Sequence, residues 1–137
     1  MSDAPISTAV KLAPPGAGLP KPEWFIARLI FGWFRRARSR GDLAAMFEEE
    51  RERILLLAGS CDPANGTRRT LIKRLPGLED SSRDWSVFMT LEHLRTAARY
   101  RHPWFGPLDA AGWHAMAAFH LRLHRKQVEA ILAAMQR

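Results

Sequence analysis

The sequence predicts an all-α protein, an antiparallel helical bundle with four main helices. Apolar side chains recur at intervals of three and four residues in several segments, the spacing of one face of an α-helix. We find neither the alternation of apolar and polar residues typical of half-buried strands nor a Gly-rich phosphate loop in the 137 residues. Helices of this kind bury their apolar faces against one another in a bundle.

The chain length and the distribution of proline and glycine predict one domain after an N-terminal tail. A chain of 137 residues is long enough for one hydrophobic core and too short for two ordinary ones. Residues 1–21 are rich in proline and glycine and poor in large apolar groups, so we expect a flexible tail there. Residues 22–137 form the predicted single helical-bundle domain.

The first two helices are expected over residues 23–38 and about 41–58. The earlier one carries an aromatic-rich run, namely Trp24, Phe25, Leu29, Ile30, Phe31, Trp33 and Phe34. We expect this run to dock against the chain's own domain, with a membrane surface or a partner subunit as the alternative. The later helix has an apolar side that includes Leu43, Met46 and Ile54, and residues 48–53 form its expected exposed charged side.

The second half of the domain is predicted to contain an irregular connection and two more helices. Glycines and prolines make residues 59–83 irregular. Asp80, Ser81 and Ser82 are expected to cap a third helix that runs to Tyr100. The last helix begins near Ala110, after an N-capping aspartate, and continues almost to residue 137.

Composition and charge favour a soluble cytoplasmic protein, and the expected partner is a small-molecule substrate of the metal site discussed below. One cysteine, Cys61, excludes an internal disulfide, and we recognise no secretory signal. The net charge is +7, but its basic residues are scattered, and the one dense run, residues 35–40, ends a predicted helix. Nucleic acid and membrane are therefore not the expected partners.

Three histidines occupy predicted core faces and are the candidate metal ligands. His120 and His124 lie four residues apart on the last helix, so their imidazoles project from one side. His93 lies on the expected inner stripe of the third helix, together with Trp85 and Met89. Three imidazoles and one open position form the ligand set of a catalytic zinc, and they also suit nickel, cobalt, manganese or iron.

The alternative is that these histidines are hydrogen-bonded core residues. Three of them are harder to explain in this way, because each buried imidazole needs its own partner. Gln127 continues the same face and is a candidate for a supporting hydrogen bond beside the metal, or else a core-edge amide. His114 is expected to be exposed and His102 to lie in a proline-bounded loop, so both are secondary candidates. No residue can be assigned a catalytic role, and Cys61 is interpreted as a bystander.

Several motifs in residues 42–137 resemble the DinB-like (DinB/YfiT) superfamily of metal-binding four-helix bundles. They are the segment 75–82, Trp85-Ser86-Val87 leading to Leu91-Glu92-His93-Leu94, the segment 102–108, and Trp113 followed by His120-x-x-x-His124-x-x-Gln127. The resemblance implies that His93, His120 and His124 hold one divalent metal, zinc or nickel. It also implies a metal-dependent transferase or hydrolase, with a low-molecular-weight thiol as a further cofactor.

The chain departs from this family between Tyr100 and His102, where relatives carry a further bundle helix. The N-terminal aromatic helix or a second subunit could fill that place, so a homodimer is one expected arrangement. Two other functions compete with the metalloprotein. One is a non-enzymatic helical interaction module, and the other is a nucleic-acid or membrane-surface binder that uses residues 24–40.

Overall fold

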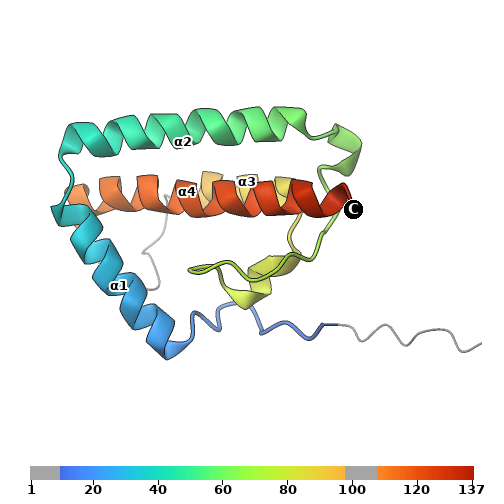
Figure 1. Ribbon diagram of the computed structural model, residues 1–137, viewed down its shortest axis with the longest axis horizontal. Helices are drawn as coiled ribbons and strands as arrows, with labels where there is room; N and C mark the ends of the chain where they lie inside the picture. Colours follow the sequence, from blue (N-terminus) through green and yellow to red (C-terminus); the bar gives the residue numbers. More distant parts are fainter. Residues whose placement is uncertain (1–9, 98–107) are drawn as a thin grey trace, which may run out of the picture.

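The computed structural model describes residues 10–97 and 108–137, and this part of the chain is all-helical (Figure 1). Its four α-helices are α1 (Lys21–Arg36), α2 (Arg40–Ser60), α3 (Val87–Ala97) and α4 (Ala110–Met135). Two short 3-10 helices, η1 (Pro63–Asn65) and η2 (Asp80–Asp84), lie between α2 and α3. The prediction of an all-α fold with four main helices is confirmed. The expectations for residues 1–9, Tyr100 and His102 lie outside the described residues.

The longest helix, α4, lies at the centre and contacts α1, α2 and α3 (Figure 1). The sequence predicted one inward stripe on α4 that included Ala117, but Ala117 is exposed, whereas Ala118, Leu121 and Val128 are buried. The buried surface of α4 is wider than one stripe because α1, α2 and α3 pack on more than one side of it. Figure 1 also shows α2 and α4 running in the same direction, so an antiparallel arrangement of this pair is not confirmed.

Helix α1 follows Pro20 and has Pro22 in its first turn. Proline has no amide hydrogen, and amides in the first turn of a helix make no hydrogen bond within the helix, so Pro22 is tolerated there. Its inner face buries Phe31 and Phe34, and both rings make edge contacts with Phe119 of α4 at centroid distances of 5.9 and 5.5 Å. The structure thus confirms that α1 docks on its own domain. Docking uses only one face, because other large apolar side chains of α1 are exposed, among them Phe25, Leu29 and Trp33.

Helix α2 begins with a capping box in which Ser39 and Asp42 exchange side-chain and backbone hydrogen bonds. Its buried residues are Leu43, Met46, Glu50 and Ile54. The prediction that residues 48–53 form an exposed charged side is therefore wrong for Glu50, which is 1% exposed. Glu50 follows Leu43 by seven residues and Met46 by four, so it shares their face of the helix.

The connection from α2 to α3 folds back on itself and shortens the predicted third helix. The backbone of residues 70 and 72 hydrogen-bonds with that of residues 85 and 83. Residues 80–84 form η2 instead of capping a helix, and α3 begins at Val87. Ser86 accepts a hydrogen bond from the Met89 amide and so acts as the cap that Asp80–Ser82 were expected to supply. Trp85 consequently precedes α3, and Met89 is exposed rather than inward-facing.

Two apolar clusters form the core, one toward each end of α4. The first joins α1 and the beginnings of α2 and α4, and it includes Phe31, Leu43 and Met116. The second joins the ends of α2 and α4 with the connecting segment, and it includes Ile54 and Val128. Along α4, His120 lies where the first cluster gives way to the second, and His124 lies between Leu121 and Val128 of the second. None of the described helices is long and apolar enough to cross a membrane.

Candidate metal centre

The structure brings together the three histidines that the sequence singled out. Nε2 of His93 on α3 lies 3.2 Å from Nε2 of His120 on α4, and Nε2 of His124 lies 2.8 Å from that same atom. Each residue offers one ligand nitrogen, and the three ligand nitrogens lie within 4.8 Å of one another. His124 is buried, while His93 and His120 are half-buried. We call these three residues the histidine cluster.

The spacing of the cluster fits a divalent ion with imidazole ligands. Two nitrogens bound tetrahedrally to zinc at 2.0–2.1 Å are separated by about 3.4 Å. The Nε2 separations of 3.2 and 2.8 Å are shorter than that value by about 0.2 and 0.6 Å, differences that small rotations of the rings would remove. Each imidazole Nε2 offers one in-plane position, occupied by either a proton or a lone pair. One proton on His120 cannot serve both neighbours, whereas a central cation can meet all three lone pairs.

Gln127 fixes the protonation of one of these rings. Its amide nitrogen donates to the Ser82 carbonyl at 2.7 Å, which turns its oxygen Oε1 toward His124. That oxygen lies 2.7 Å from Nδ1 of His124, so Nδ1 must carry the proton and donate. The neutral ring then keeps its lone pair on Nε2, which faces the cluster. Gln127 is 0% exposed, so water does not compete for these bonds.

Trp85 and the local burial hold the rings and favour their neutral form. The Trp85 ring contacts His93 edge-on at 5.2 Å and lies parallel to His124 at 6.3 Å, measured between centroids. Burial lowers the pKa of the His93 imidazole, and the negative charge of Glu79 opposes this shift in part. A lowered pKa keeps His93 neutral near pH 7, and the neutral ring is the form that binds metals.

The secondary candidates lie elsewhere. His114 was expected to be exposed, but it is half-buried and shares a shallow hollow with Phe47 and Trp113. α2 packs against α4, and this neighbour covers part of the imidazole. Cys61 is buried at the end of α2, where its thiol contacts the Asp62 carbonyl at 3.5 Å. His102 lies outside the described residues.

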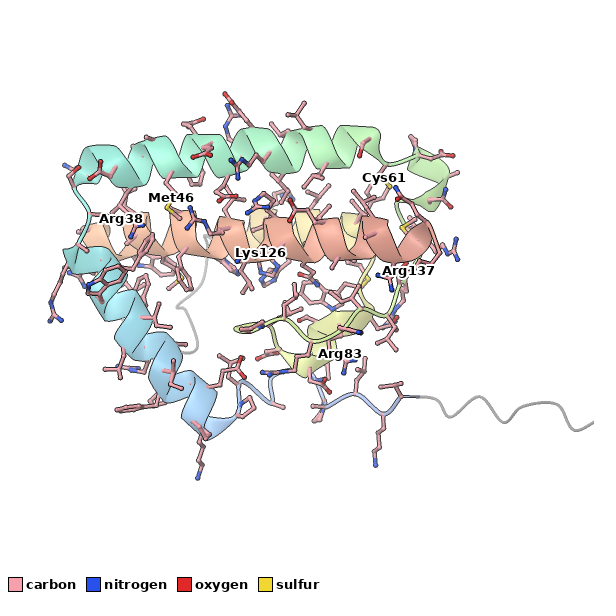
Figure 2. The ribbon with its side chains drawn as sticks, viewed as in Figure 1. Arg38, Met46, Cys61, Arg83, Lys126 and Arg137 are labelled. Carbon is pink, nitrogen blue, oxygen red and sulfur yellow. The ribbon has the colours of Figure 1, made fainter. Side chains whose placement is uncertain are left out.

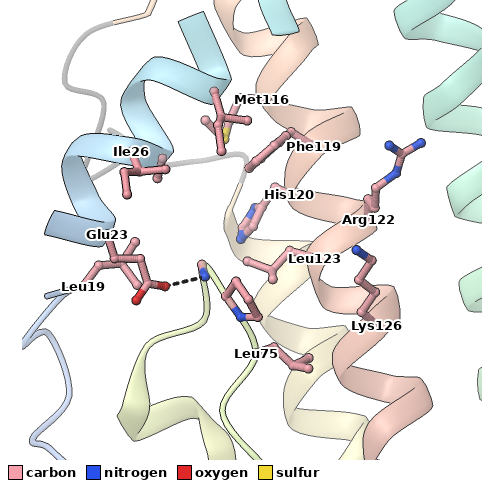
Figure 3. Close-up of a pocket in the computed structure, with 14 residues that line it drawn as sticks. Leu19, Glu23, Ile26, Leu75, Met116, Phe119, His120, Arg122, Leu123 and Lys126 are labelled. Carbon is pink, nitrogen blue, oxygen red and sulfur yellow. Dashed lines mark hydrogen bonds between the residues drawn. The ribbon is translucent and has the colours of Figure 1, made fainter. Parts of the chain in front are cut away.

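A cavity of about 360 Å³ reaches the histidine cluster from the side of α1 (Figure 3). Residues of α1, α4 and the turn at 75–77 line it, and His120 forms part of its wall. Glu23 of α1 accepts a hydrogen bond from the Gly77 amide at 2.7 Å and pairs with Arg74 at 2.5 Å, which ties α1 to this turn. Gly77 has a φ of +82°, a conformation that other residues rarely adopt.

A second group of polar side chains joins α2 to α4, the two helices that Figure 2 shows running side by side with side chains between them. The carboxylate of Glu50 pairs with Arg122 at 2.8 Å and also with Arg125, which in turn pairs with Glu129 at 2.6 Å. Burial raises the pKa of Glu50, but the hydrogen bonds from Arg122 and Arg125 outweigh it and hold the pKa below its usual value. We call these four residues the ion-pair cluster. The sequence did not reveal this cluster, because the run of charged residues 48–53 is typical of an exposed helix side.

Comparisons of the chain with protein-family models, with curated proteins and with solved structures found no match. Any inference about function therefore depends on the geometry of the described residues. A histidine triad in a helical protein, close enough to hold a metal ion, is what that geometry establishes.

Proposed function

We propose that the chain is a DinB-like metalloprotein in which His93, His120 and His124 hold one divalent ion, zinc or nickel. The observation that carries this proposal is the hydrogen-bond chain from the Ser82 carbonyl through Gln127 to Nδ1 of His124. Such a chain leaves a lone pair on Nε2 of His124 beside Nε2 of His120, which in turn lies next to Nε2 of His93. A purely structural histidine does not require this convergence of three ring nitrogens.

The proposed activity is that of a metal-dependent transferase or hydrolase. A bound divalent ion lowers the pKa of a water or a thiol and thus supplies a nucleophile at neutral pH. The contribution of the chain is to hold the three imidazoles neutral and in place. Trp85 packs on two of these rings, and Gln127 orients the ring of His124. The cavity beside His120 supplies room for a small-molecule substrate.

Metal binding is tested by elemental analysis and calorimetry of protein purified without an affinity tag. We expect about one zinc or nickel ion per chain, and loss of this ion in His93→Ala, His120→Ala and His124→Ala. The matched control is His114→Ala, because His114 lies on the same helix but outside the cluster. Absence of metal after incubation of the parent protein with zinc and with nickel would contradict the proposal.

Transferase activity is tested with the metal-loaded protein, a low-molecular-weight thiol and an electrophilic aryl chloride. The thiol loses its proton, its sulfur forms a bond to the ring carbon, and chloride leaves. We expect a rate above that of the solution reaction, and loss of this excess in His120→Ala. Ester hydrolysis is measured in parallel, because a water nucleophile would use the same site. Equal rates with and without protein in both assays would reject the proposed enzymatic function.

The outer face of α1 supports a second candidate function, binding to an anionic membrane surface. Phe25, Leu29 and Trp33 recur every four residues on this face and are 58%, 60% and 66% exposed. Arg28 and Arg36 lie on the same helix, and the chain carries a net charge of +7. Exposed aromatic and aliphatic side chains beside cations are the pattern of a helix that lies on anionic lipid.

Vesicle sedimentation tests this second function. We expect the protein to bind vesicles of phosphatidylserine and phosphatidylcholine more strongly than vesicles of phosphatidylcholine alone, and less strongly as salt rises. Leu29→Asp should weaken the binding, whereas Leu56→Asp, an exposed residue of α2, should not. Binding that ignores both lipid charge and salt would reject the membrane function. The homodimer expected from the sequence stays a prediction, and light scattering of the purified chain measures it.

A further inference from the structure

The cavity between α1 and α4 has walls that are almost entirely apolar. Its floor and sides are formed by hydrocarbon and aromatic groups, chiefly Leu19, Ile26, Ile30, Leu75, Phe119 and Leu123. Its volume of about 360 Å³ lies in the range of pockets that bind small organic molecules. Figure 3 shows Leu19 and Ile26 on one side and Phe119 and Leu123 on the other, with His120 between them. An occupant with an apolar body would make contact on several sides.

Two of the three charged groups that line the cavity, Glu23 and Arg122, are already engaged, and the third, Lys126, is exposed to solvent. Glu23 accepts the Gly77 amide and pairs with Arg74, while Arg122 pairs with Glu50 of the ion-pair cluster. A charged or strongly polar ligand body would lose water without gaining an equivalent partner from these groups. The apolar walls gain free energy only from a ligand that buries apolar surface against them.

His120 is the polar group that joins the cavity to the histidine cluster. Its ring lines the cavity, and its Nε2 lies next to the Nε2 atoms of His93 and His124. A ligand that fills the apolar part can therefore direct one polar end group toward His120. This placement selects molecules with a polar end and an aliphatic chain over molecules that are polar throughout.

We infer that the cavity between α1 and α4 binds medium-chain aliphatic molecules with a single polar end group, which lies toward His120. This inference deepens the proposed function by naming its substrate class, and it rests on that function only for the reaction at the polar end. Binding of the aliphatic chain itself requires the cavity alone. The two claims can therefore be tested separately.

Calorimetric titration of the 137-residue protein with 1-octanol, with and without zinc, tests the cavity. We expect saturable binding of one molecule per chain in both states. Binding of 1-butanol should be much weaker, because each buried methylene strengthens binding roughly fourfold. Failure of 1-octanol to saturate, or equal affinities for 1-butanol and 1-octanol, would overturn the inference.

Two neighbouring residues of α1 provide a matched pair of variants. Ile26 lines the cavity and Phe25 does not, yet they are 53% and 58% exposed, so neither change should unfold the chain. Ile26→Glu should weaken 1-octanol binding about tenfold or more, because it places a charge in the apolar wall. Phe25→Glu should leave the affinity unchanged. Equal weakening in both variants would show adsorption on the outer face of α1 and would overturn the inference.

The octanol titration and the metal measurement fail independently. Octanol binding to a chain that takes up no zinc would support the cavity assignment and reject the metalloprotein. Zinc uptake without octanol binding would do the reverse. Octanohydroxamate, whose end group binds metals, should bind the zinc-loaded parent more tightly than it binds zinc-treated His93→Ala, while 1-octanol should distinguish the two proteins little. Equal hydroxamate affinities in a parent that holds zinc would place the polar end away from His120 and overturn that part of the inference.

Discussion

The histidine cluster and the ion-pair cluster both bring polar side chains into contact with the helical core, but their charges differ. The ion-pair cluster joins α2 to α4 and contains two carboxylates and two guanidinium groups, which neutralise one another. Glu50 pairs with Arg122 and Arg125, which lie far from it in the chain. The histidine cluster faces α3 and contains three imidazoles whose Nε2 atoms point together. The first cluster supplies its own counter-charges, whereas the second is suited to receive a cation.

This difference separates a polar group that holds helices together from one that can bind a ligand. Removing Glu50, the buried carboxylate of the ion-pair cluster, takes the shared counter-charge from Arg122 and Arg125, which destabilises the fold directly. Removing a member of the histidine cluster leaves neutral groups behind and should affect metal binding more than folding. The following predictions test this contrast, from the largest expected effect to the smallest.

Glu50→Ala should destabilise the fold most, by about 3–5 kcal/mol, because it leaves Arg122 and Arg125 without their shared carboxylate. Urea unfolding followed by circular dichroism measures this change. Glu48→Ala is the matched control on the same helix, since the Glu48–Arg51 pair is exposed and should contribute less than about 1 kcal/mol. Similar losses in the two variants would remove the distinction between the buried and the exposed pair.

His124→Ala should abolish the stabilisation that zinc gives to the parent. A ligand present at about 1,000 times its Kd adds roughly 4 kcal/mol to the stability of the folded state. We expect zinc to raise the Tm of the parent and of His114→Ala, but not that of His124→Ala, as measured by thermal unfolding with and without metal. If His124→Ala lowered the Tm of the metal-free protein as much as that of the zinc-treated protein, His124 would act chiefly in packing.

Gln127→Leu should weaken zinc binding by about 10- to 100-fold, because Nδ1 of His124 loses the acceptor that fixes its proton. The same change leaves the Ser82 carbonyl without its donor, so a stability loss of about 1–3 kcal/mol should accompany it. Competition with a zinc chelator measures the affinity. Gln136→Leu, at the exposed end of α4, is the control and should bind zinc as the parent does.

The stability difference between the parent and Glu50→Gln should depend on pH. The pKa of Glu50 is held below its usual value in the folded chain, so its carboxylate contributes stability that is fully present above about pH 4.5. This contribution is lost as the pH falls through the lowered folded pKa. Urea unfolding between pH 3 and pH 7 should show the two proteins converging at the acid end, and a constant difference would contradict the role of the charge.

Much of the fold and the members of the histidine cluster could be predicted from the sequence because both depend on local spacing. Two histidines four residues apart must share a helix face, and the aspartate at position 109 does cap α4 by accepting from the Gly112 amide. The spacing from Leu43 to Glu50 also carried the signal for burial of Glu50, but a run of charged neighbours masked it. Its partners Arg122 and Arg125 lie more than 70 positions away.

Other features could not be predicted because they depend on contacts between distant segments. The sequence placed Trp85 on one helix stripe with His93, but Trp85 contacts His93 and His124 from the connection before α3. There, η2 replaces the first turn of the predicted helix. The cavity required α1 to lie obliquely beside α4, with Glu23 bound to the turn at Gly77 (Figure 1, Figure 3). Helical periodicity gives no information about such an angle or about what fills the space beneath it.

The hydrogen bond between Gln127 and Ser82 also has a consequence for the order of events in folding. His120 and His124 come together as soon as α4 winds, but Gln127 and Ser82 are separated by 45 positions in the chain. Closing so long a loop is slow compared with forming a helix turn. The chain should therefore hold metal weakly at first and tightly only after the connecting segment has docked, so that the rate of tight metal capture would report the last step of assembly.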